Sequence, residues 1–330
     1  MGRQRISVVM ATYNGERFLR QQLHSISLQS SPPDEIIVAD DASVDSTVNI
    51  VREFTRHSRV PVKLTIREKN LGYTRNFWKA LKLSSGDFIF LADQDDVWKR
   101  NKIATILQEF ANTDRMMVSH DIEVVDQHDK TLVHSYYGAA RSMNISPAIV
   151  IHGCATAFRR ELLELAGFPA CPKLWAYDTW LCGIATALGS RVLVDNPLIT
   201  HRIHEDNTCG WYLPPLRGLR SLMHKTGLPP FTTSSDFDYL MEFYATPDNI
   251  SEFESRIRTI SKERGQQDLE SVWKSLALRK AMIAFLADSR YADPLFRFPR
   301  CASLFTGLAY RTGGRLRGLS MDILGRRGPV

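Results

Sequence analysis

The sequence lacks the patterns that mark zinc sites, disulfide scaffolds and membrane-spanning helices. Its five cysteines include no C-x-x-C pair, so neither a zinc site nor a disulfide framework is expected. It contains no run of about 18 apolar residues, the length typical of a transmembrane helix. The N-terminus shows no signal-peptide pattern. We therefore expect a reduced protein in the cytoplasm.

Two glycine-rich phosphate-binding motifs are also missing. Neither G-x-x-x-x-G-K-[ST] nor G-x-G-x-x-G occurs, so we do not expect a glycine-rich loop that cradles phosphates. A divalent cation that bridges a diphosphate is the expected substitute, because Mg²⁺ is commonly bound through carboxylates together with substrate phosphates.

The positive charge is concentrated at one end of the chain. The net charge of the 330 residues is +6, and residues 290–330 carry eight Arg and two Asp, which alone gives +6. The body before this tail is near neutral, which argues against a nucleic-acid partner. The tail also holds apolar residues. It could lie on an anionic membrane surface, or pack on the rest of the protein as a helix with its arginines in solvent.

Apolar segments and helical periodicities alternate through the first part of the chain. Strands are predicted at 6–10, 35–40, 62–67, 88–92 and 116–120, with helices between them. Repeated βα units of this length predict an α/β fold with a mainly parallel central sheet flanked by helices. Further on we expect a helix that begins near residue 178, a strand at 192–194 and a polar loop at 201–211.

Paired prolines divide the chain into two predicted parts. They stand at 214–215 and 229–230 and bracket a predicted linker segment. Beyond them, apolar residues at helical spacing predict helices around 250–260 and 269–276. We predict a first domain over 1–225 and a C-terminal helical extension with a basic tail over 226–330.

Three polar clusters directly follow predicted strands, at residues 12–14, 40–41 and 93–96. Ligands of a parallel sheet bind beyond the carboxyl ends of its strands, so we expect these clusters on one rim. Asp93 and Asp95 form a D-x-D pattern whose hard oxygen ligands suit Mg²⁺ or Mn²⁺. The alternative is a solvated turn that caps the next helix, and Asp96 is predicted to be such a turn or helix-cap residue.

Adjacent strand residues point in opposite directions, so only one of Asp40 and Asp41 can face a cleft. We favour Asp41, whose carboxylate could accept a base N–H or a ribose hydroxyl, and expect Asp40 to cap a turn or meet backbone amides. Arg75, in the first turns of a helix, could meet a phosphate or lie on a solvated face.

The second half of the chain offers two more candidates. His204 lies in the polar loop and is a candidate third metal ligand, with His201 less favoured. Asp178 opens a helix, where a carboxylate often caps free N–H groups, but such a position does not exclude a catalytic role.

Taken in order, the motifs closely resemble glycosyltransferase family 2, which has the GT-A fold. They are SVVMATYNG at 7–15, VADDASVDST at 38–47, NLG at 70–72 and DQDDVW at 93–98. The similarity continues through GC at 153–154, DTWL at 178–181 and HRIH at 201–204. The subset that the chain is most similar to is the bacterial rhamnosyltransferase-like group, which builds surface polysaccharides such as O-antigen or capsule.

This resemblance implies an inverting, metal-dependent transfer from a nucleotide-diphosphate sugar, dTDP- or UDP-linked, to a glycan or polyprenyl-diphosphate-linked acceptor. Mn²⁺ or Mg²⁺ would be held by Asp95 and His204, with Asp93 on the ribose or metal side. Asp178 falls where the family places its catalytic base. The nucleotide-sugar would be held by Thr12, Tyr13, Asn14, Asp41, Arg75 and Asp93. The first domain would then be the catalytic one, and the basic tail could place it at the inner face of the cytoplasmic membrane.

Two other readings stay open. A nucleotidyltransferase also combines an α/β sheet with acidic metal ligands, but it usually needs a glycine-rich basic loop where this chain has ATYNG at 11–15. A nucleotide-sugar-binding protein without activity is the other, and the presence of Asp95, Asp178 and His204 argues against it.

Overall fold

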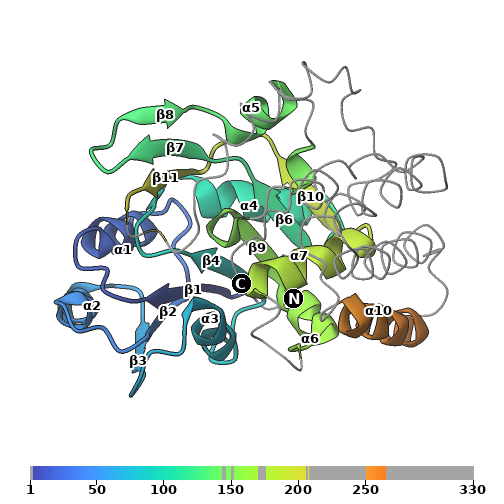
Figure 1. Ribbon diagram of the computed structural model, residues 1–330, viewed down its shortest axis with the longest axis horizontal. Coiled ribbons are helices and arrows are strands. Elements are labelled where there is room, and N and C mark those ends of the chain that lie inside the picture. The colour runs from blue at the N-terminus through green and yellow to red at the C-terminus, as the bar shows by residue number, and fades with distance from the viewer. Residues whose placement is uncertain are drawn as a thin grey trace, which may run out of the picture. The chain divides into compact units, whose positions relative to one another are not determined.

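The computed structural model describes residues 3–142, 146–149, 152–169, 176–205, 207 and 250–264 (Figure 1). In its first part, strands and helices alternate as the sequence predicts. These elements are β1 (Ile6–Thr12), α1 (Leu19–Ser27), β2 (Glu35–Asp40), α2 (Thr47–His57), β3 (Val62–Ile66), α3 (Tyr73–Leu81), β4 (Phe88–Ala92), β5 (Val97–Trp98), α4 (Lys102–Ala111) and β6 (Met117–His120).

The remaining described elements are shorter and less regular. They are β7 (Glu123–Asp126), β8 (Thr131–Val133), α5 (Tyr136–Ser142), the 3₁₀ turns η1 (Pro147–Ile149) and η2 (Gly153–Ala155), β9 (Thr156–Arg159), α6 (Arg160–Ala166), α7 (Tyr177–Ala187), β10 (Arg191–Val194), β11 (Ile199–Ile203) and α10 (Ile250–Arg264).

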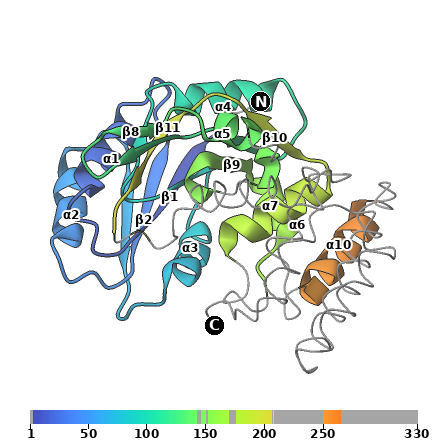
Figure 2. The same cartoon turned by 45° about the horizontal axis from the view of Figure 1, so that its top comes forward.

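A seven-stranded sheet in the order β10-β6-β9-β4-β1-β2-β3 forms the centre of the fold. Its neighbours are parallel except at β9, which runs antiparallel to both β4 and β6. The β4 strand is apolar along its whole length because every one of its residues is buried. Helices cover both faces, with α2 and α3 on opposite sides of β1 and β2 (Figure 2). The predicted mainly parallel sheet flanked by helices is confirmed.

The carboxyl ends of β1, β2 and β4 meet at one edge of this sheet. Thr12 pairs with Asp40 at the end of β1 and β2, and Met10 pairs with Ala92 at the end of β4. The residues that follow these strands therefore lie side by side, as the sequence predicts. The Asp41 N–H donates to the Thr12 carbonyl at 2.8 Å and extends the pairing by one step.

A second sheet of four strands, β5-β11-β7-β8, was not predicted. The segment from residue 201 was expected to be loop, but its first three residues belong to β11, which pairs antiparallel with β5 and parallel with β7. The prediction was wrong because His201 and Arg202 are polar. In the fold their side chains pair with buried acidic and carbonyl groups, so polarity here does not indicate solvent.

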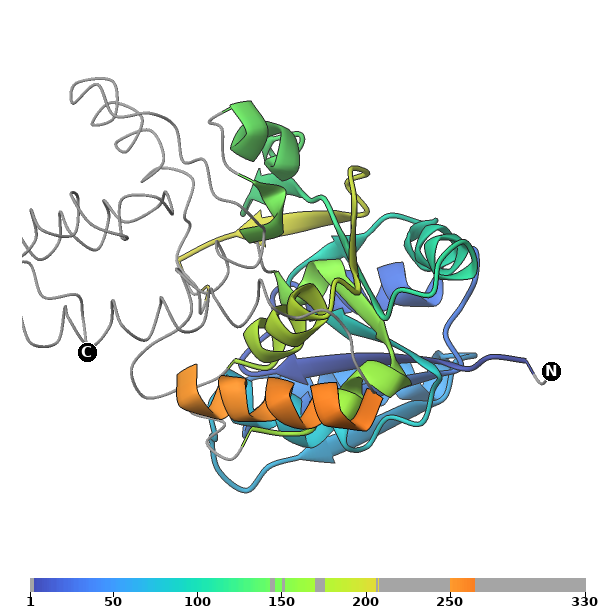
Figure 3. The same ribbon diagram turned by 90° about the vertical axis from the view of Figure 1, so that its right-hand side faces the viewer.

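Two compact units divide the chain, one of residues 1–142 and 150–212 and one of 143–149 and 213–330. In the second, α10 is one continuous helix (Figure 3). Its side chains Phe253, Ile257 and Ile260 are buried, as the helical spacing predicts. The prolines at 214–215 and 229–230, the helix at 269–276 and the tail at 290–330 lie outside the described residues. The boundary at 225 stays a prediction.

None of the helices in the described part of the chain combines the length and apolar character that a membrane crossing requires.

Candidate functional site

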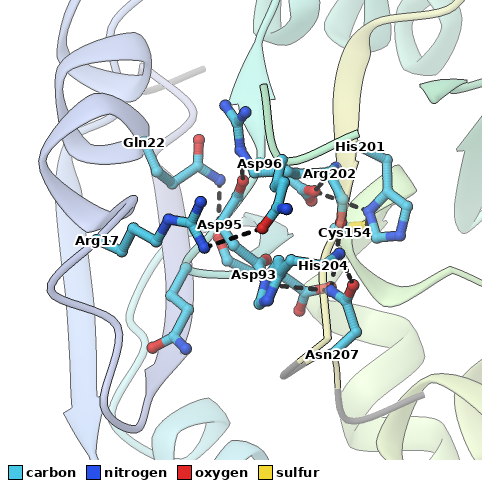
Figure 4. Close-up of polar contacts among 12 residues, drawn as sticks. Arg17, Gln22, Asp93, Asp95, Asp96, Cys154, His201, Arg202, His204 and Asn207 are labelled. Carbon is cyan, nitrogen blue, oxygen red and sulfur yellow. Dashed lines mark hydrogen bonds and ion pairs between the residues drawn. The ribbon is translucent and has the colours of Figure 1, made fainter. Parts of the chain in front are cut away.

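The site is built around residues 93–96, here called the acidic turn, which connect β4 to β5 (Figure 4). Two side chains from other elements hold its backbone. The Gln22 amide on α1 donates to the Asp93 carbonyl at 2.8 Å, and Arg202 Nε on β11 donates to the Asp95 carbonyl at 3.2 Å. These two bonds use backbone carbonyls of the turn and not the carboxylates of Asp93 and Asp95.

Arg202 is a buried junction of the site that the sequence analysis did not single out. It is 1% exposed, and its guanidinium also donates to Asp129 at 2.7 Å and to Gln21 at 3.0 Å. Its charge lies 4.6 Å from the centre of the Phe18 ring. Arg202 thereby joins β11, α1 and the turn between β7 and β8 around the acidic turn. Its position in the sequence between the two candidate histidines could have indicated that Arg202 belongs to the site.

The two predicted metal ligands Asp95 and His204 meet directly. Their Oδ2 and Nε2 atoms are 2.9 Å apart, and the Asn207 amide lies 3.4 Å from the same Oδ2 (Figure 4). Within the described residues, His204 Nδ1 is buried without a hydrogen-bond partner. Two neighbouring ligands of an octahedral ion at about 2.1 Å lie about 3 Å apart, so this spacing fits Mg²⁺ or Mn²⁺.

Asp93 lies on the same turn in a half-buried position. Burial and the nearby charges of Asp96 and Asp95 raise the pKa of Asp93 to about 8. A cation at this turn would relieve that repulsion. Asp93, Asp95 and His204 do not, however, form a tight triad in the described part of the chain, where the one group of three ligand atoms within 4.8 Å of one another belongs to Asp96, Cys154 and His201.

Asp96 belongs to the acidic turn but is not a helix-cap residue, because α4 begins only at Lys102. Its carboxylate is fully buried, and its Oδ1 lies 2.7 Å from His201 Nδ1. Burial of His201 opposes its charged form, but Asp96, Asp95 and Asp93 outweigh that effect and raise the pKa of His201 to about 9. Asp96, the last residue of the acidic turn, therefore forms a buried ion pair with His201.

The cluster of Asp96, Cys154 and His201 has residue types that suit a soft metal, but its charges are already compensated. Besides the His201 cation, Lys102 Nζ donates to the Cys154 carbonyl at 2.6 Å and lies 3.8 Å from the centre of the Trp98 ring. Burial lowers the pKa of Lys102 to about 7 against the pull of Cys154, Asp96 and Asp93. We therefore assign this cluster to the support of the acidic turn.

Residues 12–15 comprise the last residue of β1 and the three that follow it, and are here called the nucleoside loop after the contact that the sequence analysis predicts for them. Thr12 Oγ1 donates to Asp40 at 2.9 Å. Asn14 has a positive φ of 47°, and its side-chain oxygen accepts the Val44 N–H at 3.0 Å. Tyr13 is 46% exposed. The loop thus presents one aromatic ring to solvent on a backbone that is fixed from β2.

Asp40 and Asp41 both bind backbone amides, whereas we expected only Asp40 to do so. Asp40 accepts the Ser43 N–H at 2.9 Å, and Asp41 accepts those of Leu71 and Gly72 at 2.8 and 2.9 Å. Both carboxylates are buried. The choice of Asp41 as the nucleoside contact stays a prediction. Arg75 is exposed on α3.

Asp178 is the second residue of α7, and the N-cap position belongs to Ala176. Its carboxylate accepts the Thr179 N–H at 2.8 Å, so it binds the first turn without being the cap residue itself. Burial raises the pKa of Asp178, partly opposed by hydrogen bonds from Thr179 and the Gly153 backbone. A raised carboxylate pKa suits a general base.

Tyr177 directly precedes Asp178, and its phenol also lies near Asp93 of the acidic turn. It is 3% exposed and stacks on Phe77 with ring centres 4.0 Å apart. Burial, followed by the charges of Asp93 and Asp178, raises its pKa well above the ordinary value. The phenol therefore lies near both carboxylates and stays neutral at ordinary pH.

Comparison with known proteins gives sequence relatives over much of the chain. Residues 7–165 match the family model described as Glycosyl transferase family 2. An uncharacterized glycosyltransferase of Nostoc sp. is 27% identical over 282 residues, which cover 82% of this chain and 86% of that protein. The dTDP-rhamnosyl transferase RfbG of Shigella flexneri is 27% identical over 221 residues, covering 61% and 73%. The putative teichuronic acid biosynthesis glycosyltransferase TuaG of Bacillus subtilis is 29% identical over 180 residues, covering 53% and 70%.

Solved structures resemble the fold along nearly the whole chain. S. aureus TarS in complex with UDP matches with a TM-score of 0.55 at 16% identity, covering 97% of this chain and 88% of that chain. The mannosyltransferase PcManGT from Pyrobaculum calidifontis, in complex with GDP-Man and Mn²⁺, matches with a TM-score of 0.51 at 20% identity, covering 98% and 88%.

Proposed function

Because the chain belongs to glycosyltransferase family 2 and has the GT-A fold, we propose that it is an inverting, metal-dependent enzyme of surface-polysaccharide synthesis. It would move a sugar from a nucleoside-diphosphate sugar to a hydroxyl group of a glycan or lipid-linked acceptor. The observation that carries this proposal is the direct meeting of Asp95 and His204 at 2.9 Å, on the rim where Asp93 and the nucleoside loop also lie.

The acidic turn would serve the leaving group. A divalent cation held by Asp95 and His204, with Asp93 beside it, would supply the charge that stabilises the departing diphosphate. The Asp95–His204 spacing and the raised pKa of Asp93 support this placement. The nucleoside loop, Asp41 and Arg75 would hold the nucleotide part of the donor.

Asp178 would serve the acceptor as general base. Its carboxylate removes the proton of the acceptor hydroxyl while that oxygen forms a bond to the anomeric carbon. The bond between the anomeric carbon and the diphosphate oxygen breaks on the opposite face, so the configuration inverts. The raised pKa of Asp178 supports this role, since a carboxylate with a raised pKa accepts a proton more readily than an ordinary one.

The relatives indicate which donors to test first. One is named a dTDP-rhamnosyl transferase and another is named for teichuronic acid biosynthesis. We propose a dTDP- or UDP-linked sugar as donor and a saccharide, free or on a polyprenyl diphosphate, as acceptor.

The basic tail at 290–330 gives a separate test of a lipid-linked acceptor. We propose that it attaches the protein to an anionic membrane surface through its arginines and apolar side chains. The full chain should then cosediment with vesicles that contain phosphatidylglycerol, and the chain without residues 290–330 should not. Equal cosedimentation of both would overturn the membrane role of the tail.

The test of the function starts with a thermal-shift screen of UDP-, dTDP- and GDP-sugars with Mn²⁺. The donor that stabilises the wild-type protein is then used for transfer to saccharide acceptors, with the anomeric configuration of the product determined by NMR. Asp178→Asn should bind this donor but transfer poorly, whereas the exposed control Asp195→Asn should behave as wild type. Near-normal turnover of Asp178→Asn would remove Asp178 as the base, and a retained anomer would overturn the inverting mechanism.

A further inference from the structure

We infer that Gln94 is a positioning residue that locks the nucleoside loop to the acidic turn, so that nucleotide and divalent cation bind cooperatively through the protein. The inference rests on the proposed function, because it assumes that the loop binds the nucleotide and the turn binds the cation. The role inferred for Gln94 requires no contact with either ligand. It lies between the two candidate acidic ligands in sequence, and its side chain binds backbone on another element.

The Gln94 amide makes two hydrogen bonds to a single residue of the loop. Its Oε1 accepts the Tyr13 N–H at 2.9 Å, and its Nε2 donates to the Tyr13 carbonyl at 3.0 Å. Both backbone polar groups of Tyr13 are thereby satisfied by one side chain, as they would be by a neighbouring strand. An uncharged carboxamide supplies the acceptor and the donor on two neighbouring atoms, whereas an ionised carboxylate only accepts and an ammonium only donates.

Gly15 makes room for this contact. A Cβ atom at position 15 would collide with Gln94 Oε1 and lie 2.6 Å from its Cδ. Gly15 is held in place, since its N–H donates to Thr47 Oγ1 at 2.7 Å. Any larger residue at position 15 must therefore push the Gln94 amide away from Tyr13.

Apart from the Gln94 bonds, the nucleoside loop and the acidic turn are held by different neighbouring elements. The loop is tied to β2 and its following residues through Asn14, whose N–H donates to Ser43 Oγ at 2.9 Å. The turn is tied to α1 and β11 through Gln22 and Arg202. In the described part of the chain, the two Gln94 bonds are the side-chain hydrogen bonds that join loop and turn.

A shared anchor of this kind makes the two binding events interdependent. A nucleotide that orders the loop also orders the turn, so the cation meets a site whose carboxylates are already placed. By linkage the cation strengthens nucleotide binding by the same factor. Direct contact between the cation and the diphosphate also contributes to the coupling factor, and it does so in every variant. Substitution of Gln94 removes only the part of the coupling that passes through its two hydrogen bonds to Tyr13.

The test measures this factor in Gln94→Met, Gly15→Ala and the double variant. The probes are Mn²⁺ and whichever of UDP, dTDP and GDP stabilises the wild-type protein most in a thermal-shift assay. Mn²⁺ affinity is measured by electron paramagnetic resonance with and without the nucleotide, and the ratio of the two dissociation constants is the coupling factor. Gln94→Met keeps the side-chain length without the amide, and Gln127→Met, at a half-buried site on the turn after β7, is the matched control.

We expect the coupling factor to fall about fivefold or more in Gln94→Met and in Gly15→Ala, with no further fall in the double variant. The control should keep the wild-type factor. If Gly15→Ala does not fold, Gln94→Glu replaces it: this variant keeps the acceptor for Tyr13 N–H, loses the donor and should lie between wild type and Gln94→Met.

Two results would overturn the inference. One is a coupling factor in Gln94→Met within about twofold of wild type, and the other is multiplication of the two single effects in the double variant. If either result is obtained with a protein that binds nucleotide and transfers sugar, the role of Gln94 is rejected but the proposed function is not. A wild-type protein that binds none of the three nucleotides with Mn²⁺ would overturn the proposed function as well.

Discussion

Asp95 Oδ2 and His204 Nε2 lie 2.9 Å apart although the two residues are separated by 109 positions in the chain. One follows β4 in the central sheet, and the other follows β11 in the small sheet. The pair is 13% and 7% exposed, so it is shielded from bulk water while one imidazole nitrogen stays unbonded within the described residues. This arrangement can exchange the contact between the two side chains for contacts to a shared cation.

Loss of either member of this pair should remove cation-dependent nucleotide binding. Asp95→Ala and His204→Gln are each expected to weaken Mn²⁺-dependent nucleotide binding by about 100-fold, because even partners outside the ligand shell are worth about 10- to 100-fold. Titration calorimetry with and without Mn²⁺ measures the effect, and Asp195→Asn is the control. Unchanged binding by Asp95→Ala would exclude this residue from the metal site.

Asp178→Asn should slow transfer without weakening donor binding. The substitution keeps the shape of the side chain and removes its basicity, so kcat should fall by about 100- to 10,000-fold. Steady-state kinetics with the donor and acceptor found in the screen measure kcat, and calorimetry measures donor affinity. A fall in donor affinity of similar size would indicate that Asp178 binds the donor instead.

The rate should also depend on pH through Asp178. Burial raises its pKa above the ordinary aspartate value of 3.8, and a base must be deprotonated to act. Activity is therefore complete above the folded-state pKa and is lost as the pH falls through it. The acid limb of kcat/KM should lie above pH 3.8 and disappear in Asp178→Asn. An unchanged limb in that variant would assign it to another group.

The ion pair between Asp96 and His201 should stabilise the folded protein. His201→Gln leaves the fully buried carboxylate of Asp96 without its nearest cation, which is expected to cost about 3–5 kcal/mol in the free energy of unfolding. Urea denaturation measures this loss. His134→Gln, at a histidine side chain that is 89% exposed, should change stability little. A loss in His201→Gln no larger than in the control would show that Lys102 compensates Asp96 alone.

Gly153 should tolerate no side chain while Tyr177 is present. A Cβ atom there would lie 2.5 Å from the Tyr177 hydroxyl oxygen, and Tyr177 is fixed by its stacking on Phe77. Gly153→Ala should therefore destabilise the protein by about 1–3 kcal/mol, as other overpacked sites do. In the background of Tyr177→Ala the same substitution should cost much less. Equal costs in both backgrounds, measured by thermal unfolding, would contradict the steric explanation.

The fold was predictable where the spacing of apolar residues matches the periodicity of the helix or strand that they form. The β4 strand is apolar throughout because both of its faces are covered, and the residues that follow β1, β2 and β4 share a rim because parallel strands end together. The small sheet was not predictable, since β11 carries Thr200, His201 and Arg202, residues typical of a loop. Thr200 binds Glu123, and His201 and Arg202 bind Asp96 and the Asp95 carbonyl of the acidic turn, all of which are distant in sequence.

The residues of the candidate site also divide into those that the sequence could indicate and those that it could not. Asp93, Asp95, Asp178 and His204 could be chosen from the sequence because motif order and strand ends indicate them. Asp96 was predicted as a turn or cap residue without its buried ion pair to His201, and Gln94 was passed over as the spacer of a D-x-D pattern. Their roles depend on His201 and Tyr13, which lie in other segments of the chain.

The sequence by itself determined the α/β class, the resemblance to a glycosyltransferase family and the set of chemical groups available at the rim, because these depend on local periodicity and on residue types in order. Only the tertiary structure decided which oxygen meets which nitrogen. It paired Asp95 with His204, buried Asp96 against His201 and joined Gln94 to Tyr13. The physical reason is that charge compensation and hydrogen bonding act over a few ångströms in space, whatever the separation along the chain.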